Sequence, residues 1–110
     1  MKDFRIRKEM NHFFSGYLSK GYRSKKGNNE HRANYKRAFK FVAWTNEVYN
    51  VNTIHRIGKK HVIYFYYHLL EEGLSHKTIR DYHRSISLLW VFSGKKSTVP
   101  DPRLICTNSD

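Results

Sequence analysis

The side chains best suited to chemistry in this sequence are its histidines, its tyrosines and the basic residues of two segments. The chain contains seven histidines and eight tyrosines among 110 residues. His61 and His68 are seven positions apart, as are His76 and His83. On a helix that spacing corresponds to two turns, or roughly 10 Å, which is too far for both imidazoles to bind one metal ion. We therefore expect no metal site.

The tyrosines are the candidate nucleophiles. A phenol titrates near pH ~10, so a tyrosine nucleophile needs cationic groups and a general base in a formed pocket. Tyr35, Tyr66 and Tyr82 fall on apolar helical stripes and are expected to be structural. Tyr64 and Tyr67 lie off the main stripe and are expected at the surface. Since a glycine-rich phosphate loop is also missing, we expect no catalytic residue, no cofactor and no small-molecule ligand.

The basic residues of two predicted helices form the third group. They recur three or four positions apart, so they share one side of each helix. Lys and Arg neutralise phosphates, and Arg can also hydrogen-bond guanine edges in the major groove. A merely solvated helix face is the alternative interpretation of each strip. With the hydroxyl side chains beside them, the candidate DNA-binding residues are Arg32, Lys36, Arg37, Lys40, Lys77, Thr78, Arg80, Arg84 and Ser87.

The composition favours an anionic partner. The chain has 21 Lys and Arg against nine acids, a formal charge of +12, with aromatic residues interleaved. Such a balance is typical of proteins that bind nucleic acid, and we expect double-stranded DNA. RNA and an anionic membrane surface remain alternatives.

The cysteine content and the hydropathy of the sequence indicate in which cellular compartment the protein is expected. The single cysteine, Cys106, excludes an intrachain disulfide and a cysteine-based zinc site. The sequence shows no apolar signal region and no run of about 18 apolar residues. We therefore expect a cytoplasmic protein that is neither secreted nor membrane-spanning.

Four helices must position these side chains. Apolar residues recur at helical spacing in residues 3–20, 31–49, 59–72 and 76–93, and no strand-like alternation persists. Residues 21–30 read as a polar, glycine-bearing loop and 50–58 as a connection. The residues expected to face the core are Ile6, Met10, Phe13, Phe14, Tyr17, Leu18, Ala38, Phe39, Phe41, Val42, Trp44, Val48, Tyr49, Val51, Ile54, Ile57, Val62, Phe65, Tyr66, Leu69, Leu70, Ile79, Tyr82, Ile86, Leu89 and Trp90.

The last of these helices has both ends marked. Ser75 is a good N-cap, because its hydroxyl accepts a hydrogen bond from a first-turn amide that has no helical partner. Gly73 supplies the turn before the helix, and Gly94 suits the left-handed position just after it. The pattern predicts an all-α domain over residues 1–94, built as two helix hairpins. Residues 95–110 are predicted to be an irregular linker or tail.

The last helix and its turn carry a family resemblance. The segment from Leu69 to Ile86, together with Leu89-Trp90-Val91-Phe92 and Pro100-Asp101-Pro102, resembles the N-terminal core-binding domain of tyrosine recombinases, the phage-integrase family. Upstream, Tyr35 and Phe39-Lys40-Phe41-Val42-Ala43-Trp44 are similar to that domain's second helix. The resemblance extends over roughly residues 3–102.

The resemblance implies a SAM-like four-helix bundle that clamps one side of a DNA duplex, with its second and fourth helices toward the major groove. It also implies partners, namely a C-terminal catalytic domain or other recombinase protomers. The family's catalytic His-x-x-Arg is not in this chain, since no histidine has an arginine three positions later. We therefore expect a DNA-binding module of a site-specific recombinase without catalysis of its own.

A stand-alone regulator or accessory factor with a helix-turn-helix is the alternative. The segment from Glu72 to Arg80 superficially looks like the turn of that motif. However, Leu69 lies four positions before Gly73, where the motif requires a small residue for close helix packing. The last predicted helix is also longer than a short recognition helix.

Overall fold

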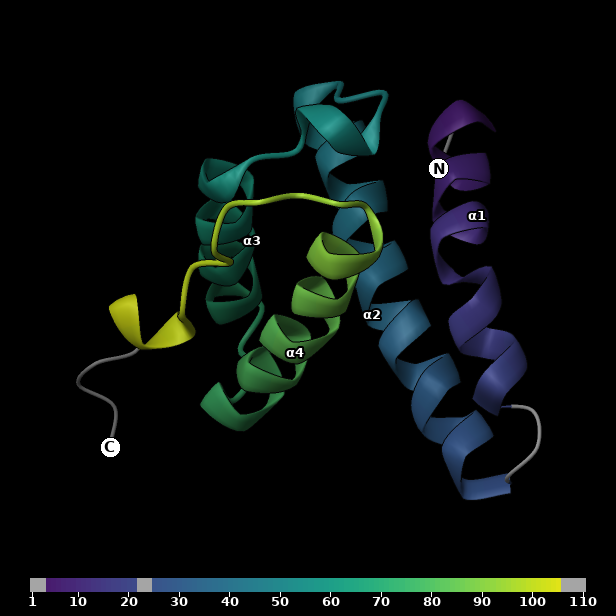
Figure 1. The fold of residues 1–110 in the computed structure, drawn as a ribbon. Coiled ribbons are helices and arrows are strands. Elements are labelled where there is room, and N and C mark those ends of the chain that lie inside the picture. The colour runs from purple at the N-terminus through teal and green to yellow at the C-terminus, as the bar shows by residue number, and fades with distance from the viewer. Residues whose placement is uncertain (1–3, 22–24, 106–110) are drawn as a thin grey trace.

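The computed structural model describes residues 4–21 and 25–105 (Figure 1). Over these residues the chain is helical, without strands, which confirms the all-α prediction of four helices. None of the described helices is long and apolar enough to cross a membrane. The elements are α1 (Phe4–Gly21), α2 (Lys25–Tyr49), the 3-10 turn η1 (Ile54–Arg56), α3 (Lys59–Glu71), α4 (His76–Phe92) and the 3-10 turn η2 (Pro102–Leu104).

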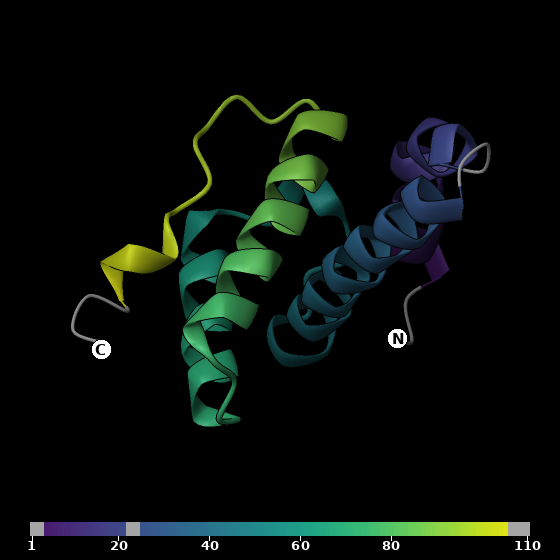
Figure 2. The same cartoon turned by 90° about the horizontal axis from the view of Figure 1, so that it is seen from below.

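The first two helices form an antiparallel hairpin, with α1 beside α2 in Figure 1, and Figure 2 shows α1 nearly end-on beside the first part of α2. Apolar contact and polar pairing both contribute. The rings of Phe14 and Tyr35 meet edge to face, with centroids 5.5 Å apart. The Asn34 amide donates to the Tyr17 hydroxyl at 2.9 Å, and the Tyr35 hydroxyl donates to Asn11. Asn11, Phe14 and Tyr17 of α1 therefore pack against Asn34 and Tyr35 of α2.

The start of α2 differs from the sequence-based expectation. Residues 21–30 were expected to be a loop, but Gly21 belongs to α1 and residues 25–30 belong to α2, while 22–24 lie outside the described residues. These positions carry no apolar periodicity, so only loop-like composition was visible in the sequence. Adding residues to a helix that is already nucleated and packed costs little free energy. The helix α2 can therefore extend toward its N-terminus through residues without an apolar pattern. Its other end is marked by Asn50, whose φ of 56° is the left-handed conformation common after helices.

The second hairpin joins α3 to α4 through a tight turn. Gly73 in the turn has φ +83°, and Gly94 after α4 has φ +77°, both in the region that glycine reaches without steric cost. The Thr78 N–H donates to the Ser75 hydroxyl at 3.2 Å, so Ser75 caps α4. The three predicted end signals of this helix are confirmed.

One core joins the two hairpins, and the predicted stripes supply nearly all of it. The residues with no more than 9% exposure include Ile6, Met10, Phe14, Ala38, Val42, Val51, Ile54, Ile57, Val62, Phe65, Tyr66, Leu69, Ile79, Tyr82, Ile86, Leu89 and Trp90. Phe13, Tyr17, Leu18, Phe39 and Leu70 are partly buried against them. Val48 and Tyr49 were expected in the core but are 52% and 41% exposed. They are the last two residues of α2, and the ring of Tyr49 contacts those of Trp44, His61 and Tyr64.

The chain after α4, predicted to be an irregular linker or tail, folds back against the helices over residues 95–105. The Tyr66 hydroxyl donates to the Pro100 carbonyl at 2.8 Å in a buried position. The Trp90 indole donates to the Ser97 hydroxyl at 3.1 Å, and Val99 packs against the core. Apart from η2 the segment is irregular, as expected, but side chains distant in sequence hold it against the helices, which local periodicity does not reveal. Residues 106–110 lie outside the described part of the chain.

A buried histidine organises the start of α3. His61 is 6% exposed, and its Nδ1 accepts a hydrogen bond from the Gly58 N–H at 2.9 Å. Burial lowers the pKa of the imidazole below its ordinary value of 6.5, and the positive charges of Lys60 and Lys95 lower it further. The same bond needs the neutral ring, because a protonated Nδ1 has no lone pair to accept it.

We expect the protein to lose stability as the pH falls through about 6.5. The folded state keeps His61 neutral, whereas the unfolded chain binds the proton, so acid favours unfolding. The stabilisation is fully present above pH 6.5 and declines below it, by at most about 1.4 kcal/mol per pH unit for one proton. Chemical denaturation between pH 7.5 and 5.5 measures this. His61→Gln should flatten the pH dependence, whereas His12→Gln, at an exposed position, should keep it; equal profiles for the two variants would contradict the assignment.

Candidate nucleic-acid interface

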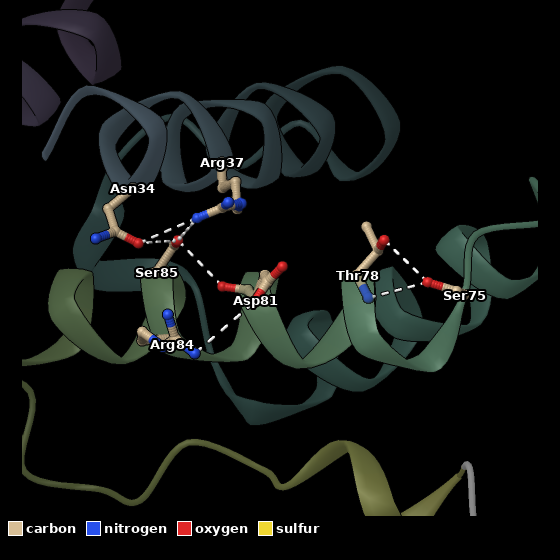
Figure 3. A network of polar contacts seen from close by, with 7 residues as sticks. All are labelled: Asn34, Arg37, Ser75, Thr78, Asp81, Arg84 and Ser85. Atoms are coloured by element: carbon tan, nitrogen blue, oxygen red, sulfur yellow. Dashed lines mark hydrogen bonds and ion pairs between the residues drawn. The ribbon is translucent and has the colours of Figure 1, made fainter. Parts of the chain in front are cut away.

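The two helices that carry the basic strips pack directly against each other. At their contact the Ser85 hydroxyl donates to the Asn34 side-chain oxygen at 2.8 Å (Figure 3). Arg37 adds hydrogen bonds from Nη1 to the Asn34 oxygen at 3.2 Å and to the Ser85 hydroxyl at 3.4 Å. Ser85 is fully buried and Asn34 nearly so. A satisfied buried network of this kind fixes one helix against the other, because a shift would leave polar groups unpaired.

This network places Arg37 differently from the other basic residues of α2. Its guanidinium is half-buried at the contact with α4, so it supports the packing of the two helices. Sequence reasoning missed Asn34 and Ser85, whose positions on the buried side of each helix were the available signal. Arg37 therefore lies where the two basic strips meet.

The other three predicted DNA-binding residues of α2 are exposed to solvent. Arg32, Lys36 and Lys40 are exposed, at four-residue spacing along one side of the helix. The Lys40 ammonium lies 5.9 Å from the centre of the Tyr82 ring of α4, a cation–π arrangement across the helix contact. The exposed basic side of α2 thus continues onto α4.

On α4 the predicted residues fall into two groups. Lys77, Arg80 and Arg84 are exposed, and Arg84 is 63% exposed with its guanidinium 3.7 Å from the Asp81 carboxylate (Figure 3). At that exposure the ion pair is weak and easily exchanged for a phosphate. Within the described ranges Lys77 and Arg80 form no ion pair.

The two hydroxyl residues of the α4 strip are already used within the helix. The Thr78 and Ser75 hydroxyls are 3.0 Å apart at the N-cap. The Ser87 hydroxyl donates to the His83 carbonyl at 2.7 Å. Both side chains are half-buried, so they are less available to a ligand than the neighbouring cations.

Few acids counter this basic surface. Asp81 is the only acid in α4, and Glu30 and Glu47 are the only ones in α2. Glu9 is turned inward, where its carboxylate accepts from the Thr53 hydroxyl at 2.9 Å and from a backbone N–H of η1 at 2.7 Å. The side of the molecule formed by α2 and α4 therefore carries a strong positive field.

Other chemistry finds no comparable support in the described residues. They contain no group of three or more His, Cys, Asp or Glu side chains placed to hold a metal ion. Tyr66 and Tyr82 are buried in the core, while Tyr64 and Tyr67 are exposed on α3. Among the described residues, the exposed cations of α2 and α4 are therefore the best candidate for a functional site, and their chemistry suits an anionic ligand.

Comparison with known proteins finds no match to this chain among family models, curated proteins or solved structures. The function proposed for this chain therefore rests on its own geometry and charge, together with the resemblance of its motifs.

Proposed function

We propose that this protein is a cytoplasmic duplex-DNA-binding domain that grips DNA through one face formed by α2 and α4. We propose further that it acts as the core-binding module of a site-specific tyrosine recombinase. Catalysis would then be supplied by a separate domain or by recombinase protomers.

The observation that carries the proposal is the direct packing of the two basic helices. The buried Asn34–Ser85 pair holds α2 against α4, and Lys40 lies over a ring of the neighbouring helix. Two cationic strips with a fixed separation can follow phosphates along a duplex, whereas one mobile strip gives only diffuse attraction.

The helical order adds support for the recombinase assignment. The resemblance implies four helices with the second and fourth toward DNA. The chain has four helices, and α2 and α4 pack together with Arg32, Lys36, Lys40, Lys77, Arg80 and Arg84 exposed. The proline-marked segment after α4 packs back on α3 through Tyr66 and Pro100. A following domain would therefore start from a defined position.

One feature favours the alternative of a helix-turn-helix regulator, namely the tight, capped turn between α3 and α4. Against it, Leu69 is fully buried four residues before Gly73. Apolar side chains of α4 are also buried as far as Trp90, close to its end. The α4 helix is therefore a core element along its whole length rather than a short recognition helix docked on one partner.

We expect the affinity for duplex DNA to fall steeply as salt is raised. Each phosphate neutralised in the complex releases about 0.9 of a counterion, so roughly six contacts give a slope near −5 in a plot of log affinity against log salt. Fluorescence anisotropy with a labelled duplex measures the slope. Structured RNA and anionic vesicles are the matched competitors. A slope near zero, or stronger binding to either competitor, would reject the proposed function.

A further inference from the structure

A second surface, distinct in chemistry from the basic face, lies between the C-terminal end of α2 and the outer side of α3. It is an open hollow of about 470 Å³. Four aromatic rings, one histidine and one carboxylate line most of it, from Trp44, Tyr49, Tyr64, Tyr67, His68 and Glu71. Among the described residues, no Lys or Arg side chain lines it.

Three of the rings, those of Trp44, Tyr49 and Tyr64, form a connected group. Trp44 and Tyr49 meet edge to face with centroids 5.3 Å apart, and Tyr49 stacks with Tyr64 at 5.8 Å. Tyr64 and Tyr67 are 45% and 49% exposed, although both are large aromatic side chains in a small helical domain. The contact with Tyr49 limits the motion of Tyr64, so this part of the aromatic wall is formed before any ligand arrives.

The carboxylate at the rim completes a specific chemistry. Glu71 is exposed and makes no ion pair with any other described residue. Its neighbour Glu72 pairs with His68 at 3.3 Å, so the two adjacent acids have different surroundings. An acid in the same lining as several aromatic rings attracts a cation, since ring faces carry negative electrostatic potential.

We propose that this hollow binds the guanidinium of an arginine presented by a partner polypeptide. A guanidinium is planar and stacks on aromatic faces, and its N–H groups form a fork that matches a carboxylate. A quaternary ammonium has no N–H for Glu71, and a lysine ammonium has no flat face for Tyr64 and Tyr67. The wall and the acid together therefore select arginine.

The occupant is a different protein rather than a second copy or DNA. Two copies of a chain with charge +12 repel each other. The Glu71 carboxylate would repel the phosphates of DNA, and the described lining contains no Lys or Arg to offset that repulsion. This inference stands independently of the proposed DNA binding, because the two surfaces share no residue.

The test is a titration of the full chain with the peptide acetyl-Ala-Arg-Ala-amide, followed by two-dimensional NMR. The indole N–H of Trp44 reports on the hollow, and that of Trp90, which is buried elsewhere, is the internal reference. We expect a saturable shift of the Trp44 resonance alone. The citrulline peptide, which is nearly the same shape but neutral, should bind about tenfold more weakly.

Two variants with the same change of charge distinguish a local effect of the hollow on peptide binding from an effect of the protein's overall charge. Glu71→Gln should weaken binding of the arginine peptide about tenfold. Glu30→Gln, near the N-terminus of α2 and away from the hollow, should leave the affinity for the peptide unchanged. Thermal melts of both variants establish that the fold is retained. Equal binding of the citrulline peptide, equal effects of the two variants, or Trp44 shifts that grow with protein concentration alone would each overturn the proposal.

Discussion

Replacing Arg80 and Arg84 together with alanine is expected to weaken duplex binding by at least about tenfold while leaving the fold nearly intact. Both side chains are exposed on α4, and the ion pair that the change removes, between Arg84 and Asp81, is weak at that exposure. Alanine is also a good helix former. Each arginine that reads a base edge should contribute roughly 1–3 kcal/mol, and each arginine that instead neutralises a phosphate should, when removed, make the salt slope shallower by about one.

The matched control removes the same two charges elsewhere. Arg56 in η1 and Lys96 after α4 are exposed and belong to neither basic helix. Their double alanine variant should bind DNA nearly as tightly as the parent chain. Anisotropy titrations and thermal melts on the two variants test the assignment together. If both variants bind equally well, the α4 strip does not contact DNA; if the α4 variant melts early and binds normally, those arginines pack against protein.

Ile86→Ala is expected to be the most destabilising single change among the variants considered. The side chain is completely buried in the core on α4. Its truncation removes buried apolar surface and leaves a cavity that neighbouring side chains fill only in part, at a cost of about 2–5 kcal/mol. Urea denaturation measures the decrease in the free energy of unfolding. DNA binding should decline only in the proportion that the variant unfolds.

Val91→Ala provides the comparison on the same helix. Val91 is 72% exposed, so its truncation should change the free energy of unfolding by no more than about 0.5 kcal/mol. Similar destabilisation by Ile86→Ala and Val91→Ala would mean that α4 is oriented differently from the structure described above. A large difference in the expected direction ties the buried stripe of α4 to the stability of the fold.

Much of the helical architecture could be predicted from the local sequence pattern of apolar spacing and helix-end residues. The stripe on α4 from Ile79 to Trp90 is buried as its spacing indicates, and Ser75, Gly73 and Gly94 adopt the capping and turn conformations that their side chains favour. These features depend on residues within a few positions of one another. Helical periodicity and end signals report such short-range physics directly.

The candidate site was only partly predictable. Exposure of Arg32, Lys36, Lys77 and Arg80 followed from their place opposite the apolar stripes. The role of Arg37 at the helix contact did not, because it depends on Asn34 and Ser85, which are 51 positions apart. The aromatic hollow likewise needed the register of α2 against α3, since its lining comes from residues 44 to 71.

The sequence by itself determined a small, strongly basic, all-helical chain with two cationic strips and a capped last helix. Charge, periodicity and capping are set by residues and their near neighbours, so they need no fold to be recognised. Only the tertiary structure decided that the cationic helices pack on each other, that residues 95–105 fold back through the Tyr66–Pro100 bond, and that Tyr49 meets Tyr64. Those contacts join distant segments, and their geometry depends on how the whole core packs rather than on any local pattern.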